Sequence, residues 1–173
     1  MGKIFYVDKS AFTTEAALKK IFSAYYGKPD VSVLRTKNGK PYVENSPSFS
    51  VTHTHDRLYI AFSDDEIGLD AEHLSRTPHY DAIIKKFHPA EQEEITCTTD
   101  FLRHWVVKES AVKYLGGTIA ADLKRLRYTN GCLTYNEQAF PAKITLLQHE
   151  DFLLAVCSNG DFENAEFIPL ETL

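Results

Sequence analysis

The sequence predicts an α+β protein with antiparallel sheets and one long helix. Several short stretches alternate apolar and polar residues, and turn residues stand between them; Asn130-Gly131 is a strong two-residue hairpin signal. A long run of helical spacing begins near Asp100 and ends at Gly116-Gly117. No repeat, linker or low-complexity tract interrupts the chain, so we expect residues 1–173 to form a single compact unit.

The first part of the chain is expected to combine one helix with several strands. Thr13 or Thr14 can cap a helix whose apolar residues recur at helical spacing up to a stop at Gly27. Turns are expected at Asn38-Gly39 and at His55-Asp56, the second within a hairpin. The strands predicted here cover residues 3–8, 31–36, 49–53, 57–63 and 66–72.

The second part of the chain begins with helices and ends with strands. From Thr77 the pattern is helical, and Pro89 opens a second, acidic helical stretch. Asp100 is a plausible N-cap for the longest helix. The strands predicted after that helix lie within residues 123–138, 142–148 and 152–158.

Composition excludes several classes of protein. The 173 residues are 43% hydrophobic, which is enough for a buried core, and the formal net charge of −5 argues against general affinity for nucleic acid or an anionic membrane. No apolar run approaches the ~18 residues that span a bilayer, and we expect a cytoplasmic protein. The three cysteines are too few and too dispersed for a disulfide framework, so we expect buried thiols.

Two acids share one face of the strand predicted at residues 66–72. A period of two puts Ile67, Leu69 and Ala71 on one face and Gly68, Asp70 and Glu72 on the other. Two carboxylates about 7 Å apart repel each other unless they face water or share a cation such as Mg²⁺. An ordinary solvated strand face would look the same.

The long helix carries a stripe that starts apolar and ends charged. Leu102, Val106, Glu109 and Lys113 fall at spacings of four, three and four residues. The pattern fits an ion pair at a half-exposed helix end. On these residues alone the ion pair is slightly favoured. The alternative is the edge of an active site, in which Glu109 is an oxygen ligand or a general base, while Lys113 and Lys108 neutralise phosphate. Trp105 is expected to anchor the helix by packing.

Four stretches in this order resemble the signatures of the Sfp-type 4′-phosphopantetheinyl transferases: "NGKP", "FSVTHTH", "IGLDAE" and "WVVKESAVK". The resemblance implies transfer of the phosphopantetheine arm of coenzyme A to a serine of an acyl, peptidyl or aryl carrier protein. The reaction would need Mg²⁺ and release adenosine 3′,5′-bisphosphate. It also implies a monomeric pseudo-dimer of two similar α/β lobes, at about residues 1–65 and 66–173, with the active site at their junction.

The resemblance assigns roles residue by residue. Asp70, Glu72 and Glu109 match the family's magnesium ligands, and Glu109 also matches the proposed base on the carrier serine. Lys113 matches the lysine that contacts the pyrophosphate and assists the leaving group. Lys108, its neighbour in the same motif, is a further candidate for a coenzyme A phosphate.

A second group of residues is assigned to coenzyme A. Thr52 and His53 stand where the family has a Ser-His pair at the phosphates, and His55 stands where it often has Gly. Typical members are longer before "NGKP", which leaves only weak substitutes for the 3′-phosphate site. The loop at the adenine end corresponds to Gly39, Lys40 and Pro41, and the substitutes are Lys19, Lys20, Lys28 and Arg35.

Two other functions are compatible with the residues. A divergent family member could bind coenzyme A or a carrier protein without transfer, although all three acids and Lys113 are present. A metal-dependent hydrolase could use His53 and His55 as ligands, but the familiar H-x-H-x-D-H arrangement needs an acid two residues after the second His, whereas Asp56 follows at once.

Overall fold

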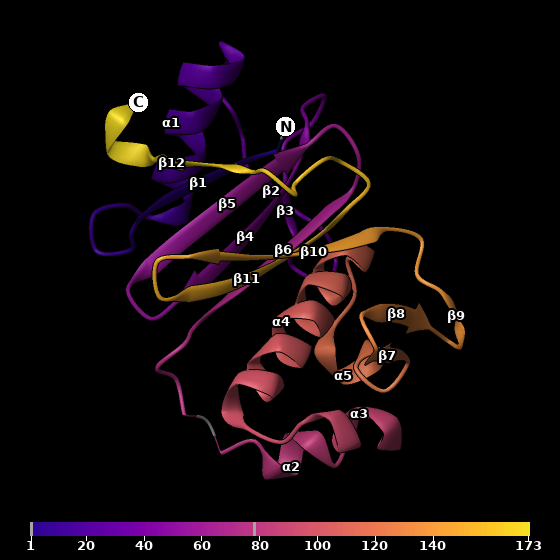
Figure 1. The fold of residues 1–173 in the computed structure, drawn as a ribbon. Coiled ribbons are helices and arrows are strands. Elements are labelled where there is room, and N and C mark those ends of the chain that lie inside the picture. Colours follow the sequence, from indigo (N-terminus) through magenta and orange to yellow (C-terminus); the bar gives the residue numbers. More distant parts are fainter. Residues whose placement is uncertain (1, 78) are drawn as a thin grey trace.

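Two sheets lie between two long helices, and this layered arrangement organises the protein (Figure 1). The structure is a computed structural model, and it describes residues 2–77 and 79–173. The architecture is mixed α and β with antiparallel sheets, as predicted. The similarity of two lobes, and the boundary between them at residue 65, stay predictions.

The strands form two principal sheets and two small ones. The order is β12-β1-β5-β4 in the first and β10-β11-β6 in the second, and β2-β3 and β7-β8-β9 are the small sheets. All pairs are antiparallel except β12 with β1. The strands are β1 (Lys3–Asp8), β2 (Leu34–Arg35), β3 (Pro41–Tyr42), β4 (Ser48–Thr54), β5 (Arg57–Ser63), β6 (Ile67–His73), β7 (Leu126–Thr129), β8 (Cys132–Tyr135), β9 (Gln138–Ala139), β10 (Lys143–His149), β11 (Phe152–Ser158) and β12 (Glu166–Pro169).

The two long helices cover the outer faces of the principal sheets. Helix α1 packs on β1, β4 and β5, and α4 packs on β6 and β11. The residues between the sheets are apolar, with Tyr59 and Ala61 of β5 against Leu69 of β6. The helices are α1 (Thr14–Tyr26), α2 (Asp81–Ile84), α3 (Pro89–Glu94), α4 (Thr98–Leu115) and α5 (Ile119–Asp122), with a final 3-10 turn, η1 (Leu170–Thr172).

Local sequence signals set the ends of the long helices. The Thr13 hydroxyl accepts a hydrogen bond from Ala16 N at the start of α1. Gly27 and Gly116 end α1 and α4 with φ of 61° each, the left-handed conformation in which glycine carries no steric penalty. These caps were predicted and are confirmed.

Strand β6 meets β4 along a seam of hydroxyl side chains. Ser50, Thr52 and Thr54 alternate along β4, and all three are buried. The Ser50 hydroxyl accepts a hydrogen bond from Leu69 N of β6 (2.9 Å). The seam therefore joins the two principal sheets through side chains, because the strands form no backbone ladder there.

Gly68 lets helix α4 lie directly on strand β6. A Cβ atom at this position would stand 1.9 Å from the Ser110 carbonyl oxygen and 2.5 Å from Tyr114 N. Both atoms belong to the helix backbone, so no side-chain rotation could make room. The face of β6 that carries Gly68, Asp70 and Glu72 is thus pressed against α4, while Ile67, Leu69 and Ala71 face the core between the sheets.

Several elements differ from the prediction. Helix α4 begins at Thr98 after Cys97, and the Asp100 carboxylate instead accepts hydrogen bonds from Thr96 N (3.1 Å) and Oγ1 (2.7 Å). The strand predicted at residues 31–36 is reduced to β2, because only two residues pair with β3. The helical pattern after Thr77 yields only the four residues of α2, since His88 is extended as the N-cap of α3.

Several short elements and two exposed thiols were also not foreseen. Strand β12 returns from the end of the chain to pair in parallel with β1, and no element was expected at β3, α5 or η1. Cys157 is buried as expected, but Cys97 and Cys132 are exposed. Of the helices that the structure describes, none has both the length and the apolarity to cross a membrane.

Substituting Gly68 should be costly. We expect Gly68→Ala to lower the free energy of unfolding by about 3 kcal/mol, because the added methyl overlaps the α4 backbone. Urea denaturation of the two proteins measures the difference. Gly160→Ala is the control, since its Cβ would approach only side-chain atoms, the nearest at 3.2 Å. Equal effects of the two substitutions would show that α4 does not press on the strand.

Candidate functional site

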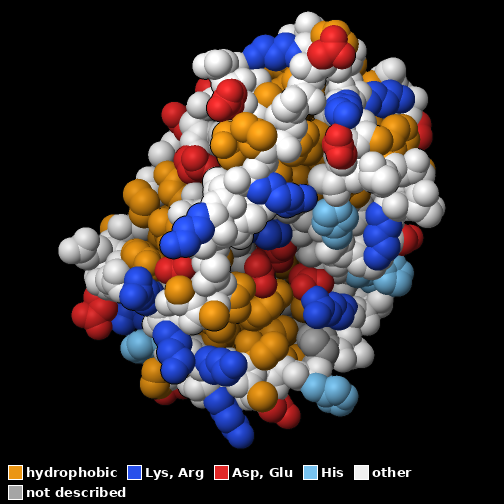
Figure 2. All heavy atoms as spheres, turned by 180° about the vertical axis from the view of Figure 1, so that it is seen from behind, with side chains coloured by type: hydrophobic (Ala, Val, Ile, Leu, Met, Phe, Trp, Pro, Cys, Tyr) orange, Lys and Arg blue, Asp and Glu red, His pale blue; other side chains and the backbone are white. Residues whose placement is uncertain are grey.

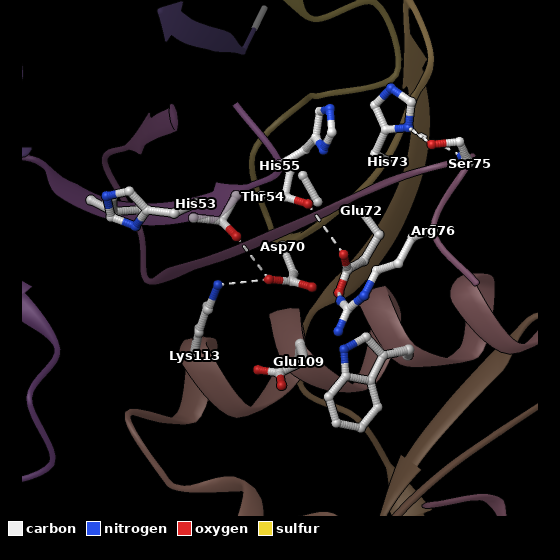
Figure 3. A pocket seen from close by; sticks show the side chains of 14 residues that line it. His53, Thr54, His55, Asp70, Glu72, His73, Ser75, Arg76, Glu109 and Lys113 are labelled. Atoms are coloured by element: carbon white, nitrogen blue, oxygen red, sulfur yellow. Dashed lines mark hydrogen bonds and ion pairs between the residues drawn. The ribbon is translucent and has the colours of Figure 1, made fainter. Parts of the chain in front are cut away.

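A large pocket opens beside the β4–β6 seam and the middle of α4. Its volume is about 840 Å³. Figure 3 shows polar side chains from both strands and from the helix pointing into it. The lining residues are Val51, Thr52, His53, Thr54, His55, Asp70, Ala71, Glu72, His73, Ser75, Arg76, Trp105, Glu109 and Lys113.

Asp70 and Glu72 are buried carboxylates, each bound by a hydroxyl of the neighbouring strand. Both are 6% exposed. Thr52 donates to Asp70 Oδ1 (2.9 Å), and Thr54 donates to Glu72 Oε2 (3.2 Å). The matching alternation of acids on β6 and hydroxyls on β4 sets these contacts, which fix how each carboxylate faces the pocket.

Each of these two acids also has a cationic partner. The Lys113 ammonium donates to Asp70 Oδ1 (2.8 Å) and to the Leu69 carbonyl oxygen (3.0 Å). The guanidinium of Arg76 forms an ion pair and a hydrogen bond with Glu72 (Figure 3). Lys113 comes from the last turn of α4 and Arg76 from the turn after β6, so the two cations approach from opposite sides.

Glu109 completes the group of acids but has no such partner among the residues the structure describes. Its side chain extends from α4 and lines the same pocket as Asp70 and Glu72 (Figure 3). Burial, followed by the nearby Asp70 charge, raises the pKa of Glu109 to about 7, against an opposing effect of Lys113. A carboxyl with this pKa can take up or release a proton near neutral pH.

The donor set fits a hard divalent cation. Three carboxylates of one pocket supply the oxygen ligands that Mg²⁺ prefers. Burial, followed by the Asp70 charge, disfavours an ionised Glu109, and a bound cation would offset both effects. Within residues 2–77 and 79–173, no three His, Cys, Asp or Glu side chains are gathered in the arrangement of a formed metal site.

A second pocket of about 290 Å³ adjoins the first, and Val51, His53 and Lys113 line both. Gly39, Lys40 and Pro41 line it on the other side, together with Arg35. The structure therefore brings the predicted adenine-end loop next to the predicted phosphate residues. Of the four basic residues considered for the 3′-phosphate, Arg35 lines this pocket.

Hydrogen bonds tie that loop to the start of β6 and to the end of α4. Lys40 pairs with Glu66 and donates to the Ile67 carbonyl oxygen (3.0 Å). Asn38 Nδ2 donates to the Gly116 carbonyl oxygen (2.8 Å) just after α4. Gly39 has a φ of 88°, which suits glycine at this turn. The loop is consequently held across the end of the helix that carries Lys113.

His53 and His55 point to different surroundings. The Nε2 atom of His53 forms a hydrogen bond with Thr14 Oγ1 (2.8 Å), and burial with the nearby Lys113 charge lowers the pKa of this imidazole. His55 has a φ of 49° in the turn, and its ring lies 4.7 Å from that of His73. The two rings do not converge on one position in Figure 3, as a shared metal ion would require.

The expectation that Lys108 binds a phosphate is wrong, because its side chain lies in the core. Its ammonium is fully buried and donates to both oxygens of Glu91 (2.7 Å each) and to the Leu126 carbonyl oxygen (2.6 Å). Burial lowers its pKa, and the Glu91 charge opposes this shift. Lys108 thus joins α4 to α3 and β7 through a core ion pair. Its neighbour Glu109 faces the pocket instead, because successive side chains on a helix are rotated by about 100°.

Several residues that line the pocket were not proposed for the site from the sequence. Arg76 and Thr54 were not proposed for the site; the polar alternation of β4 was the only sequence signal for Thr54, and none marked Arg76. Trp105 packs against Phe101 (5.9 Å between ring centroids), as expected, but it also lines the pocket.

Comparison with known proteins gives two matches. A family model described as "4′-phosphopantetheinyl transferase superfamily" matches residues 66–157, which is more than half of the chain. The 4′-phosphopantetheinyl transferase gsp of Aneurinibacillus migulanus is 25% identical over 112 residues, covering 59% of this chain and 46% of that protein. The matched part thus spans about half of the curated relative's length.

The raised pKa of Glu109 should make stability depend on pH. An ionised Glu109 is disfavoured in the folded state, so stability falls as pH rises from the ordinary value of 4.5 through about 7. We therefore expect Glu109→Gln, in EDTA, to match the unaltered protein at pH 4 and to exceed it at pH 8 by on the order of 1–3 kcal/mol.

Urea denaturation across this pH range measures the effect. Glu163→Gln is the matched control, because Glu163 is an exposed glutamate outside the pocket, and it should show no comparable difference. Parallel stability curves for Glu109→Gln and the unaltered protein would contradict the assignment.

Proposed function

The chain belongs to the 4′-phosphopantetheinyl transferase superfamily, and from this premise we propose that it transfers the phosphopantetheine arm of coenzyme A to a serine hydroxyl of a carrier protein. We further propose that the reaction depends on Mg²⁺ and releases adenosine 3′,5′-bisphosphate. The carrier would be of the acyl, peptidyl or aryl type. A monomeric state and a cytoplasmic location stay predictions.

The observation that carries this proposal is the meeting of three carboxylates and Lys113 in one pocket that adjoins a second, basic pocket. A phosphoryl transfer requires the phosphates to be positioned and their charge neutralised. Asp70, Glu72 and Glu109 would hold Mg²⁺ here. When bound, Mg²⁺ would offset the negative charge of the pyrophosphate.

Glu109 is proposed as the general base. Glu109 lines the pocket beside Asp70 and Glu72 and has no hydrogen-bond or ion-pair partner among the described residues, so its carboxylate can accept the proton of the attacking serine. The serine oxygen forms a new bond to the phosphorus that carries the pantetheine arm, and the bond from that phosphorus to the bridging pyrophosphate oxygen breaks. Lys113 lies where it can stabilise the departing phosphate.

The second pocket is proposed to receive the nucleotide end of coenzyme A. Its position supports this, because His53 and Lys113 connect it to the acids. His53 would donate to a phosphate as a neutral imidazole, in keeping with its lowered pKa. Gly39, Lys40 and Pro41 would border the adenine, and Arg35 is the nearest candidate for the 3′-phosphate. Thr52 acts through Asp70 in this arrangement.

Two alternatives lead to different measurements. A binding module without transfer would bind coenzyme A yet modify no carrier. A zinc hydrolase on His53 and His55 would hold stoichiometric zinc, which elemental analysis detects. His53 contacts Thr14 and His55 contacts His73, so the two imidazoles do not face a common metal position. This arrangement argues against the zinc hydrolase.

Intact-mass spectrometry of apo carrier proteins tests the proposal. After incubation with the protein, coenzyme A and Mg²⁺, at least one carrier of an acyl, peptidyl and aryl panel should gain the mass of one phosphopantetheine arm. EDTA should abolish the gain. Glu109→Gln should slow it by at least about 100-fold, since a general base contributes at least that factor.

Glu163→Gln serves again as the control and should react at the unaltered rate, because Glu163 lies outside both pockets. Comparable rates for Glu109→Gln and the unaltered protein would remove Glu109 from the mechanism. If coenzyme A binds but no carrier is modified, the binding module becomes the better description.

A further inference from the structure

Arg76 is the one cation of the acidic pocket, among the described residues, that the proposed chemistry does not use. It lies in the turn after β6, where its backbone N donates to the His73 carbonyl oxygen (2.9 Å). Its side chain is 51% exposed, whereas that of its partner Glu72 is 7% exposed. A largely solvated cation thus covers a buried carboxylate.

The contacts of Arg76 differ from those of Lys113. Lys113 is held by both Asp70 and the Leu69 carbonyl oxygen, and its side chain is 28% exposed. Within the described residues, the guanidinium of Arg76 bonds to Glu72 alone. Rotation of Arg76 into water therefore breaks one interaction, and the exposed guanidinium is already partly hydrated.

The charges of the pocket nearly balance in this arrangement. Asp70, Glu72 and Glu109 can carry three negative charges, and Lys113 and Arg76 carry two positive ones. The Arg76 charge also reaches Glu109, whose pKa it lowers. A divalent cation that approaches these acids meets the repulsion of Arg76 and competes with it for the oxygens of Glu72.

Figure 2 shows a face of the molecule on which acidic side chains gather near the centre, with lysine and arginine side chains around them and a hydrophobic patch alongside. The Arg76 side chain is already 51% exposed, so a displaced guanidinium has water to enter.

We propose that Arg76 is an internal counter-ion that holds Glu72 while no divalent cation is bound, leaves when one binds, and thereby weakens the affinity of the site for that cation. This inference rests on the proposed function, because it takes Asp70, Glu72 and Glu109 as the cation ligands. Arg76 is in this sense a positioning residue, which acts through Glu72.

The proposal makes two opposite predictions for Arg76→Gln. Without a divalent cation the variant should be less stable, because Glu72 then lacks its cation. In the presence of the cation it should bind more tightly, because the competitor is gone. A residue that only supports the fold would weaken both properties when removed, so the pair of measurements separates the two roles.

Titration with Mn²⁺ provides the test, because free Mn²⁺ is observed directly by electron paramagnetic resonance. We expect Arg76→Gln to bind Mn²⁺ about three- to tenfold more tightly than the unaltered protein, from the loss of one nearby positive charge. Arg76→Lys should stay close to the unaltered affinity. Mg²⁺ added in competition should displace Mn²⁺ from all variants that bind it.

Two controls complete the design. Arg103→Gln removes the same charge from an arginine of similar exposure (48%) that pairs with Asp100 outside the pocket, and its affinity should not change. Glu72→Gln removes a proposed ligand and should weaken binding.

The outcomes separate the two proposals. In the first case, the unaltered protein binds Mn²⁺ and Glu72→Gln does not. Unchanged or weaker Mn²⁺ binding by Arg76→Gln would then overturn the role of Arg76 and leave the cation site intact. Absence of binding by the unaltered protein, or no effect of Glu72→Gln, would overturn both. Tighter binding by Arg76→Gln alone, with lower stability in EDTA, would support the counter-ion.

Discussion

The close contact between the backbone of α4 and Gly68 of β6 is the constraint on which the site depends. Since no Cβ atom stands between them, the helix lies on the strand itself. Glu109 and Lys113, which share one stripe of the helix, then reach Asp70 and Glu72 on the strand. A larger residue at position 68 would separate the acids even if every one of them were retained.

The same contact forces three carboxylates into a partly buried volume, and the neighbouring elements compensate this in different ways. Strand β4 provides a hydroxyl for each strand acid, and Lys113 and Arg76 provide charge. Glu109 has no hydrogen-bond or ion-pair partner among the described residues, and burial, followed by the Asp70 charge, raises its pKa. This difference in surroundings sets Glu109, proposed both as a cation ligand and as the base, apart from Asp70 and Glu72, which are proposed as cation ligands alone.

Prediction from the sequence succeeded where one residue decides the local outcome. Thr13, Gly27 and Gly116 set the helix ends as expected, and the period of two along β6 placed Asp70 and Glu72 on one face. The three acids that the motifs singled out line one pocket, although their roles stay predictions. In these cases local geometry leaves few alternatives.

Prediction from the sequence failed where contacts between distant parts of the chain determine the local structure. Lys108 and Glu109 are adjacent, and only the position of Glu91 shows which of them enters the core. Arg76 follows no periodic pattern, since it lies in a turn, and β12 pairs with β1 from the other end of the sequence. Asp100 has the chemistry of an N-cap, but α4 already starts at Thr98. The Asp100 carboxylate therefore lies in the first turn and accepts a hydrogen bond from Thr96, which precedes the helix.

The central claim is that the acids at the α4–β6 contact bind a cation and the phosphates of coenzyme A as one unit. Calorimetric titration with coenzyme A, with and without Mg²⁺, tests it most directly. The account predicts tighter binding with Mg²⁺, and a loss of this difference in Asp70→Asn. Identical titrations of the unaltered protein with and without Mg²⁺ would contradict it.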